Sequence, residues 1–141
     1  MDITIKENNM SSWTHVAGII RIDSFRPFND EPNWDRIFGK EITYEELMDW
    51  GCEKNRKIKK HPEDFLPFGT EGSLTKTIWT NPDESCMNAY TVSIFGDLRD
   101  YDTPEEIINW FKDKCLKLNV RNAVIAAYAN CNKPLIWTYE N

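Results

Sequence analysis

The sequence contains no apolar run long enough to cross a membrane. A transmembrane helix needs about 20 predominantly apolar residues, and the chain of 141 residues has no such stretch. The first ten residues, MDITIKENNM, also lack the apolar core of a secretory signal peptide. We therefore expect a protein without a membrane partner that works in the cytoplasm.

Cysteine and histidine are few and scattered. The cysteines Cys52, Cys86, Cys115 and Cys131 form no C-x-x-C pair, which favours reduced thiols over a disulfide framework or a zinc site. No nucleophile signature surrounds the two histidines, and no P-loop, G-x-G-x-x-G or G-x-S-x-G motif occurs. The sequence therefore predicts no catalytic residue, no metal and no cofactor, and it favours a non-catalytic protein without excluding an enzyme.

Positive charge does not predominate: 17 Lys and Arg residues face 23 Asp and Glu residues. The formal net charge is -6, which disfavours a general binder of the nucleic-acid backbone. The one basic run, KNRKIKK at Lys54–Lys60, is short, and it suits the end of a helix, where the helix dipole favours cations. We expect no nucleic-acid partner.

The composition is that of an ordinary globular domain with extra aromatic residues. Hydrophobic residues make up 40% and charged residues 28% of the chain, and the length fits one domain over residues 1–141. Residues 1–10 are polar and expected to be loosely ordered. The aromatic share of 13% exceeds what a core alone requires and leaves rings for a binding face. The loop aromatics Phe28, Trp34, Phe65 and Phe68 either fold back as a satellite core, which we favour, or form part of that face.

Two helix starts are marked by capping signals. Thr43 and Glu46 match a capping box, and Thr103 with Glu106 matches a second one that carries Pro104 at the first helical position. The second helix has an apolar stripe at three- and four-residue spacing. Its members are Ile107, Ile108, Phe111, Cys115 and Leu118.

Alternating apolar residues predict strands at 13–23, 74–80, 90–95, 120–129 and 135–139. Together with the two helices, they give the order β-α-β-β-α-β plus a final strand. This order predicts an α+β, ferredoxin-like βαββαβ antiparallel sheet with helices on one face and an extra C-terminal strand.

The hairpin of 74–80 and 90–95 fixes which segments meet. Pairing across the 81–89 loop places Thr80 near Tyr90 and Leu74 near Gly96. The segments GTEGS (69–73) and GDLRDYD (96–102) then lie together. The start of the first strand, residues 11–13, is expected at the same end of the sheet.

This meeting point is the candidate ligand site. Glycine permits backbone N–H groups to face an anion, hydroxyl groups add donors, and Arg99 can bind a phosphate or carboxylate with two hydrogen bonds. The predicted ligand-binding residues are Gly69, Thr70, Glu71, Gly72, Ser73, Asp97, Arg99, Asp100 and Tyr101. The alternative is turn chemistry, in which Asp97 and Asp100 bond to local backbone and Arg99 pairs with one of them.

A carboxylate cluster at the same place raises the question of a metal. Glu71, Asp97, Asp100 and Asp102 are oxygen ligands of the kind that Mg²⁺ or Ca²⁺ prefers, but the spacing of a calcium loop is absent. Asp102 is better explained by the positive end of the following helix. We predict no metal here.

Both strands of the hairpin carry apolar side chains on each face. An uncovered face that exposes Trp79, Phe95 or Ile78 would favour a homodimer, a higher oligomer or a protein partner. The expected function is therefore a non-catalytic binding or regulatory protein that associates with a protein partner or a small anionic ligand. A phage or mobile-element accessory factor that inhibits or sequesters a host component fits a small, acidic, motif-free chain.

The alternative function is an enzyme or nucleotide-handling domain. It would use Arg99, Ser73, Glu71 and the aspartate cluster on a phosphorylated small molecule.

Overall fold

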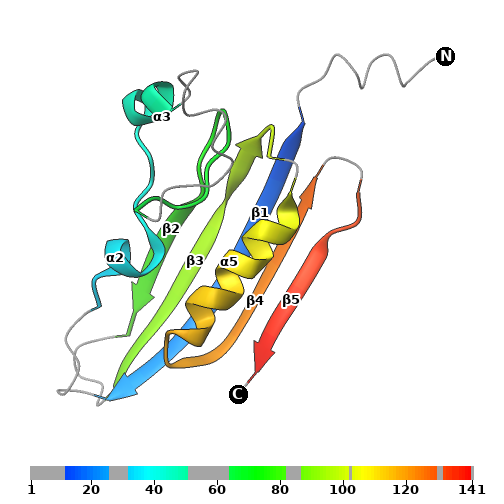
Figure 1. The fold of residues 1–141 in the computed structure, drawn as a ribbon. Coiled ribbons are helices and arrows are strands. Elements are labelled where there is room, and N and C mark those ends of the chain that lie inside the picture. Colours follow the sequence, from blue (N-terminus) through cyan, green and yellow to red (C-terminus); the bar gives the residue numbers. More distant parts are fainter. Residues whose placement is uncertain are drawn as a thin grey trace.

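One five-stranded antiparallel sheet with a single long helix across it forms the body of the protein (Figure 1). The computed structural model describes residues 12–25, 32–50, 64–81, 87–101, 103–129 and 132–140. The strands are β1 (Trp13–Phe25), β2 (Thr75–Thr80), β3 (Met87–Arg99), β4 (Val120–Ala129) and β5 (Leu135–Glu140). The helices are α2 (Trp34–Phe38), α3 (Tyr44–Trp50) and α5 (Pro104–Leu116).

The sheet is organised around β1. The strand order is β2-β3-β1-β4-β5, and each neighbouring pair is antiparallel. β1 pairs with β3 from Trp13↔Arg99 to Phe25↔Met87. Its apolar residues at both odd and even positions suit a strand with a neighbour on each side.

The ferredoxin-like prediction is wrong. That arrangement requires a helix on the sheet in each of two crossovers, and the described part of the chain between β1 and β2 contains only α2 and α3, of five and seven residues. Both lie beside the β2 edge, and α5 is the one described helix that runs along the sheet (Figure 1). The fold is dominated by its sheet, because the described strands contain more residues than the described helices.

The two predicted helix starts are both observed, with different caps. At α3, the Thr43 N–H donates to Glu46 Oε1 (3.0 Å) and the Glu46 N–H donates to Thr43 Oγ1 (3.1 Å), which confirms the capping box. α5 begins at Pro104 as predicted, but the Thr103 hydroxyl donates to the Glu106 carboxylate (2.8 Å) instead of capping the backbone.

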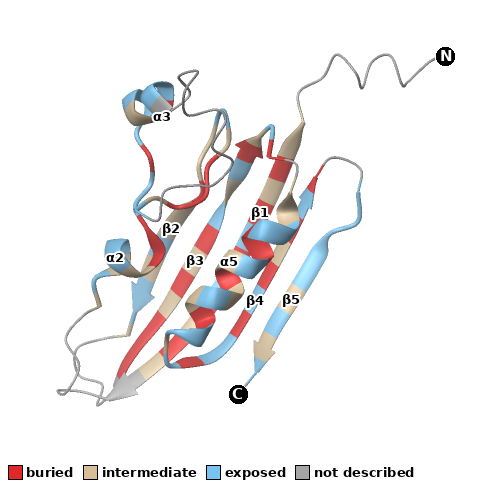
Figure 2. Cartoon of the chain, in the orientation of Figure 1, coloured by how far each residue is buried: buried red, intermediate tan, exposed pale blue. Residues whose placement is uncertain are grey.

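The core lies between α5 and one face of the sheet. Figure 2 shows the buried residues in bands along β3, β1 and β4 behind this helix. Phe111 of α5 is fully buried, and its ring meets Trp137 of β5 edge-on at 5.9 Å. A Cβ at Gly18 would lie 3.0 Å from Phe111 Cε1 and 3.2 Å from Ile125 Cβ, so glycine lets the helix approach β1 closely.

A smaller cluster forms beside the sheet. Phe68 packs with Ile42 and Leu47, and Phe65 packs against them, which confirms the satellite core for these two aromatics. Trp34 instead packs on the main core, edge-on to Tyr90 at 5.1 Å. Phe28 lies outside the described residues.

The opposite side of the sheet, which we call the open face, carries the side chains that alternate with the core residues. No described helix lies on it (Figures 1 and 2). The cross-strand register assigns six large exposed apolar side chains to this face. They are Ile19, Trp79, Phe95, Val124, Tyr128 and Ile136.

Candidate functional site

The predicted meeting of residues 69–73 with the end of β3 is confirmed. Thr80 pairs with Tyr90 as expected. The Thr70 N–H donates to the Arg99 carbonyl (3.0 Å), and the Arg99 N–H donates to the Glu71 carbonyl (2.9 Å). The Asp100 N–H donates to the Ser12 carbonyl (2.6 Å), which brings the start of β1 to the same end.

The two glycines of this loop serve a close backbone approach. A Cβ at Gly69 would lie 2.3 Å from the Arg99 carbonyl oxygen, and a Cβ at Gly72, where φ is +81°, would lie 2.2 Å from the Asp97 carbonyl oxygen. The Gly69 N–H donates to the Gly72 carbonyl (3.0 Å). The N–H groups of Gly69 and Thr70 are therefore both used within the chain.

The charged side chains of the loop bind one another. Arg99 Nη1 donates to Glu71 Oε1 (2.9 Å), and Arg99 Nε lies 3.9 Å from Asp100 Oδ2. The Thr70 hydroxyl donates to the same Asp100 oxygen (3.0 Å), and the Ser73 hydroxyl donates to the Leu74 carbonyl (2.9 Å). An anionic ligand at Arg99 would have to displace these carboxylates, and binding there stays a prediction.

Two further predicted site residues point elsewhere. Tyr101 is buried in the core, where its hydroxyl donates to Glu106 Oε2 (3.4 Å), and burial raises the pKa of that hydroxyl above its ordinary value. Its carbonyl accepts a hydrogen bond from the buried Thr14 hydroxyl. Asp97 lies on the open face and pairs with His15 Nδ1 (2.7 Å). The nine predicted residues are therefore close in space, but the side chains of Tyr101 and Asp97 bind partners outside the loop at 69–73.

The open face is the larger feature, and the sequence predicted it only in part. Trp79 and Phe95 are exposed on it as expected. Ile78 is not, because its register with Val92 places it on the α5 side, where it packs against the core. Ile19 and Val124 were missed, although their alternation with Ile20 and Ile125 was a visible signal.

The centre of the open face carries no charge. One row across the strands is Thr75, Phe95, Ala17, Ala126 and Ile136, paired in that order. The next row is Thr77, Ser93, Ile19, Val124 and Thr138. We call these two rows the central rows. Their side chains are apolar or carry only hydroxyl groups.

One end of the open face is bordered by the His15–Asp97 pair. His15 is next to Tyr128 on β4, with ring centroids 5.0 Å apart. The imidazole and the carboxylate therefore bind each other beside an aromatic ring.

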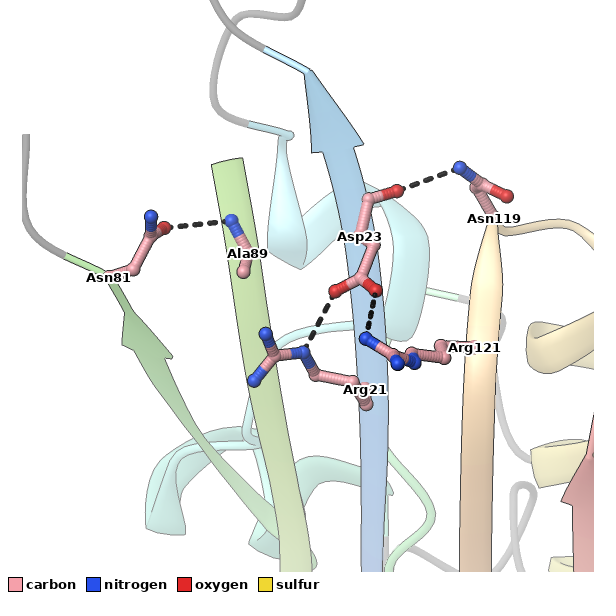
Figure 3. Close-up of polar contacts among 6 residues, drawn as sticks. All are labelled: Arg21, Asp23, Asn81, Ala89, Asn119 and Arg121. Carbon is pink, nitrogen blue, oxygen red and sulfur yellow. Dashed lines mark hydrogen bonds and ion pairs between the residues drawn. The ribbon is translucent and has the colours of Figure 1, made fainter. Parts of the chain in front are cut away.

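The other end is bordered by Asp23 and two arginines. Asp23 Oδ1 accepts from Arg21 Nε (2.9 Å), and Asp23 Oδ2 accepts from Arg121 Nη1 (3.1 Å), so the carboxylate lies between the two guanidinium groups (Figure 3). The hydrogen bond from Arg21 is the main cause that holds the pKa of Asp23 below its ordinary value. The Asn119 amide donates to the Asp23 carbonyl (2.7 Å) and ties β4 to this end of β1.

A polar depression beside α2 is a weaker candidate. Asp35 and Lys40 are among its lining residues, and both signs of charge are present. Lys76 donates to Asp35 Oδ1 (2.6 Å) and to the Gly39 carbonyl (2.8 Å), and its hydrogen bond lowers the pKa of Asp35. The contacts of Lys76 therefore attach α2 to β2, which is a structural role.

Neither a metal centre nor a membrane span is evident in the described ranges. Within them, no three His, Cys, Asp or Glu side chains are grouped so that they could hold a metal ion; Asp102 is not among the described residues. The described helices are also too short or too polar to cross a membrane. Comparison of the chain with protein-family models, with curated proteins and with solved structures found no match.

Proposed function

We propose that the protein is a non-catalytic binding or regulatory protein that associates with another protein surface through the open face. One observation carries this proposal. Of the ten large apolar side chains that are exposed in the described part of the chain, six lie on this one face. Apolar side chains that are exposed singly are ordinary, whereas a continuous apolar patch with a polar rim is typical of an interaction site.

The residue types on the open face support the same function. Trp79, Phe95 and Tyr128 bring large rings that lose little conformational entropy on binding, and aromatic residues are enriched at the energetically important centres of interfaces. The polar residues His15, Asp97 and Asp23 lie toward the two ends of the face, where a polar rim is expected.

The loop at 69–73 gives less support to the alternative of an enzyme or nucleotide-handling domain. Such a site needs converging donors, yet Arg99 binds Glu71 and the N–H groups of Gly69 and Thr70 bind backbone carbonyls. A cytoplasmic location and a role as a phage or mobile-element accessory factor both stay predictions.

The test compares two matched substitutions of exposed apolar residues by glutamate. Phe95→Glu changes the open face at a side chain that is 46% exposed, and Leu116→Glu changes the last residue of α5, which is 77% exposed. Thermal unfolding of each variant verifies that it folds. Association is then measured by light scattering of the purified protein and by retention of cell-extract proteins on the immobilised protein.

We expect every association of the wild type to survive Leu116→Glu and to be lost in Phe95→Glu. Equal association of wild type and Phe95→Glu would contradict the proposal. A thermal-shift screen with nucleotides and divalent ions tests the alternative, which predicts a stabilisation that disappears in Arg99→Ala.

A further inference from the structure

We infer that the occupant of the open face is a second copy of this chain, so that two sheets pack face to face as a symmetric dimer. This inference rests on the proposed function and names the partner. Sheets that pack in this way lie about 10 Å apart, with the side chains of both inner faces filling the space between them.

The area of the open face matches a dimer interface. With about 3.3 Å of rise per residue and about 4.8 Å between neighbouring strands, the five strands cover roughly 750 Å². A standard stable interface buries about 800 Å² on each partner. The face is therefore large enough for a stable dimer without any contribution from the loops.

The charge distribution favours a second copy over a different protein. The whole chain carries a net charge of -6, so two copies repel each other overall, and like charges brought together at the contact surface would add to that repulsion. The central rows are uncharged, and at the two ends Asp97 pairs with His15 and Asp23 pairs with both Arg21 and Arg121. Glu140 adds a negative charge at the β5 edge of the face. A foreign partner is commonly selected by complementary charge, whereas the centre of this face is uncharged and most of the charged side chains at its ends are already paired within the chain.

The shape of the central rows is complementary to itself. In the row with Phe95, two alanines, Ala17 and Ala126, lie between the bulky Phe95 and Ile136. A two-fold axis along β1 places β3 of one copy over β4 of the other, since these strands flank β1 on opposite sides. Phe95 of each copy then enters the hollow above the partner's Ala126.

The inference is tested by sedimentation equilibrium of the purified full chain from low to high micromolar concentration. We expect a wild-type mass of twice 16.6 kDa at the upper end of this range. Phe95→Glu places a charge at the interface centre, and the dimer dissociation constant is expected to rise at least ~100-fold. Leu116→Glu is the matched control and is expected to leave the constant unchanged.

Ala126→Glu is the second variant, and it keeps the test decisive if Phe95→Glu does not fold. Ala126 is a small residue that only the face-to-face geometry places at the centre of a contact, so loss of the dimer in this variant supports the inference. A wild type that remains monomeric at every concentration, or a dimer that persists in a folded open-face variant, overturns it. If the dimer is absent, the proposed function still holds provided that the wild type retains a different protein and that Phe95→Glu, but not Leu116→Glu, abolishes this retention. If neither variant changes the retention, the proposed function is wrong as well.

Discussion

Ile19 and Ile20 are adjacent residues of the same type on the central strand, and their surroundings are opposite. Ile20 is 0% exposed beneath α5, whereas Ile19 is 48% exposed on the open face. The same contrast separates Ile125 from Val124 on β4. Successive side chains of a strand point to opposite faces, so the strands present similar apolar side chains on both faces of the sheet. The face that α5 covers forms the core.

The two faces of the sheet therefore differ in what they contribute to folding. The α5 face contains most of the fully buried side chains, and burial of apolar surface is the main source of folding free energy. The open face exposes comparable apolar residues to water, which adds little to the stability of a monomer. Substitutions on the two faces should therefore have separable effects.

The largest expected effect is that of Phe111→Ala on the α5 face. Phe111 is fully buried against Gly18 and Trp137, and removing a buried phenyl ring lowers the free energy of unfolding by about 3–5 kcal/mol. The matched change on the open face, Phe95→Ala, is expected to cost less than about 1 kcal/mol in the monomer. Urea unfolding at a protein concentration that keeps both variants monomeric measures the two values. Equal losses would show that the open face is covered in the folded monomer.

A smaller effect is expected from adding one methyl group at Gly18. The new Cβ would lie 3.0 Å from Phe111 Cε1, and overpacking of this kind costs about 1–3 kcal/mol. This exceeds the gain of about 0.4–1 kcal/mol from a less flexible unfolded chain, so Gly18→Ala should destabilise the protein by about 1 kcal/mol. The control, Ala17→Ser, adds one atom on the open face and should change stability by less than about 0.5 kcal/mol. The prediction is tested by the unfolding midpoints of the wild type, Gly18→Ala and Ala17→Ser. A Gly18→Ala variant more stable than the wild type would show that α5 can shift away from β1.

Local patterns in the sequence predicted the hairpin register and both helix starts. The alternation in residues 74–80 and 90–95 fixes which residues face each other, and Thr43 and Thr103 mark helix starts through their own side chains. These features depend on neighbours in the chain or across one turn. For the same reason, the meeting of residues 69–73 with Arg99 could be predicted from the sequence.

The layer arrangement could not be predicted in this way. A capping box marks where a helix begins, but it does not determine where a seven-residue α3 lies relative to the sheet. Apolar residues on both faces of β1 predicted its central position in the sheet, but they do not show which face a helix covers; in the described part of the chain, α5 lies on one face only. Likewise, the sequence does not show whether Gly69 and Gly72 bind an anion or permit a close approach of the backbone. The positions of the Arg99 and Asp97 carbonyls in the structure show the close approach.

The smallest expected effect concerns the rim of the open face at Asp23, and it depends on pH. Because the folded pKa of this carboxyl lies below its ordinary value of 3.8, mainly through the hydrogen bond from Arg21, its contribution is present above that value and is lost as the pH falls through the folded pKa. Asp23→Asn should therefore destabilise the protein at neutral pH by at most about 1 kcal/mol, since the arginines are partly exposed. The difference between wild type and variant should disappear in acid. Arg21→Gln removes the main cause of the lowered pKa of Asp23 and should therefore weaken the pH dependence of stability. Unfolding midpoints across the acid range measure this effect. A difference that stays constant down to the lowest pH would show that the amide substitution acts through packing at the end of β1, and that the rim does not contribute through its charge.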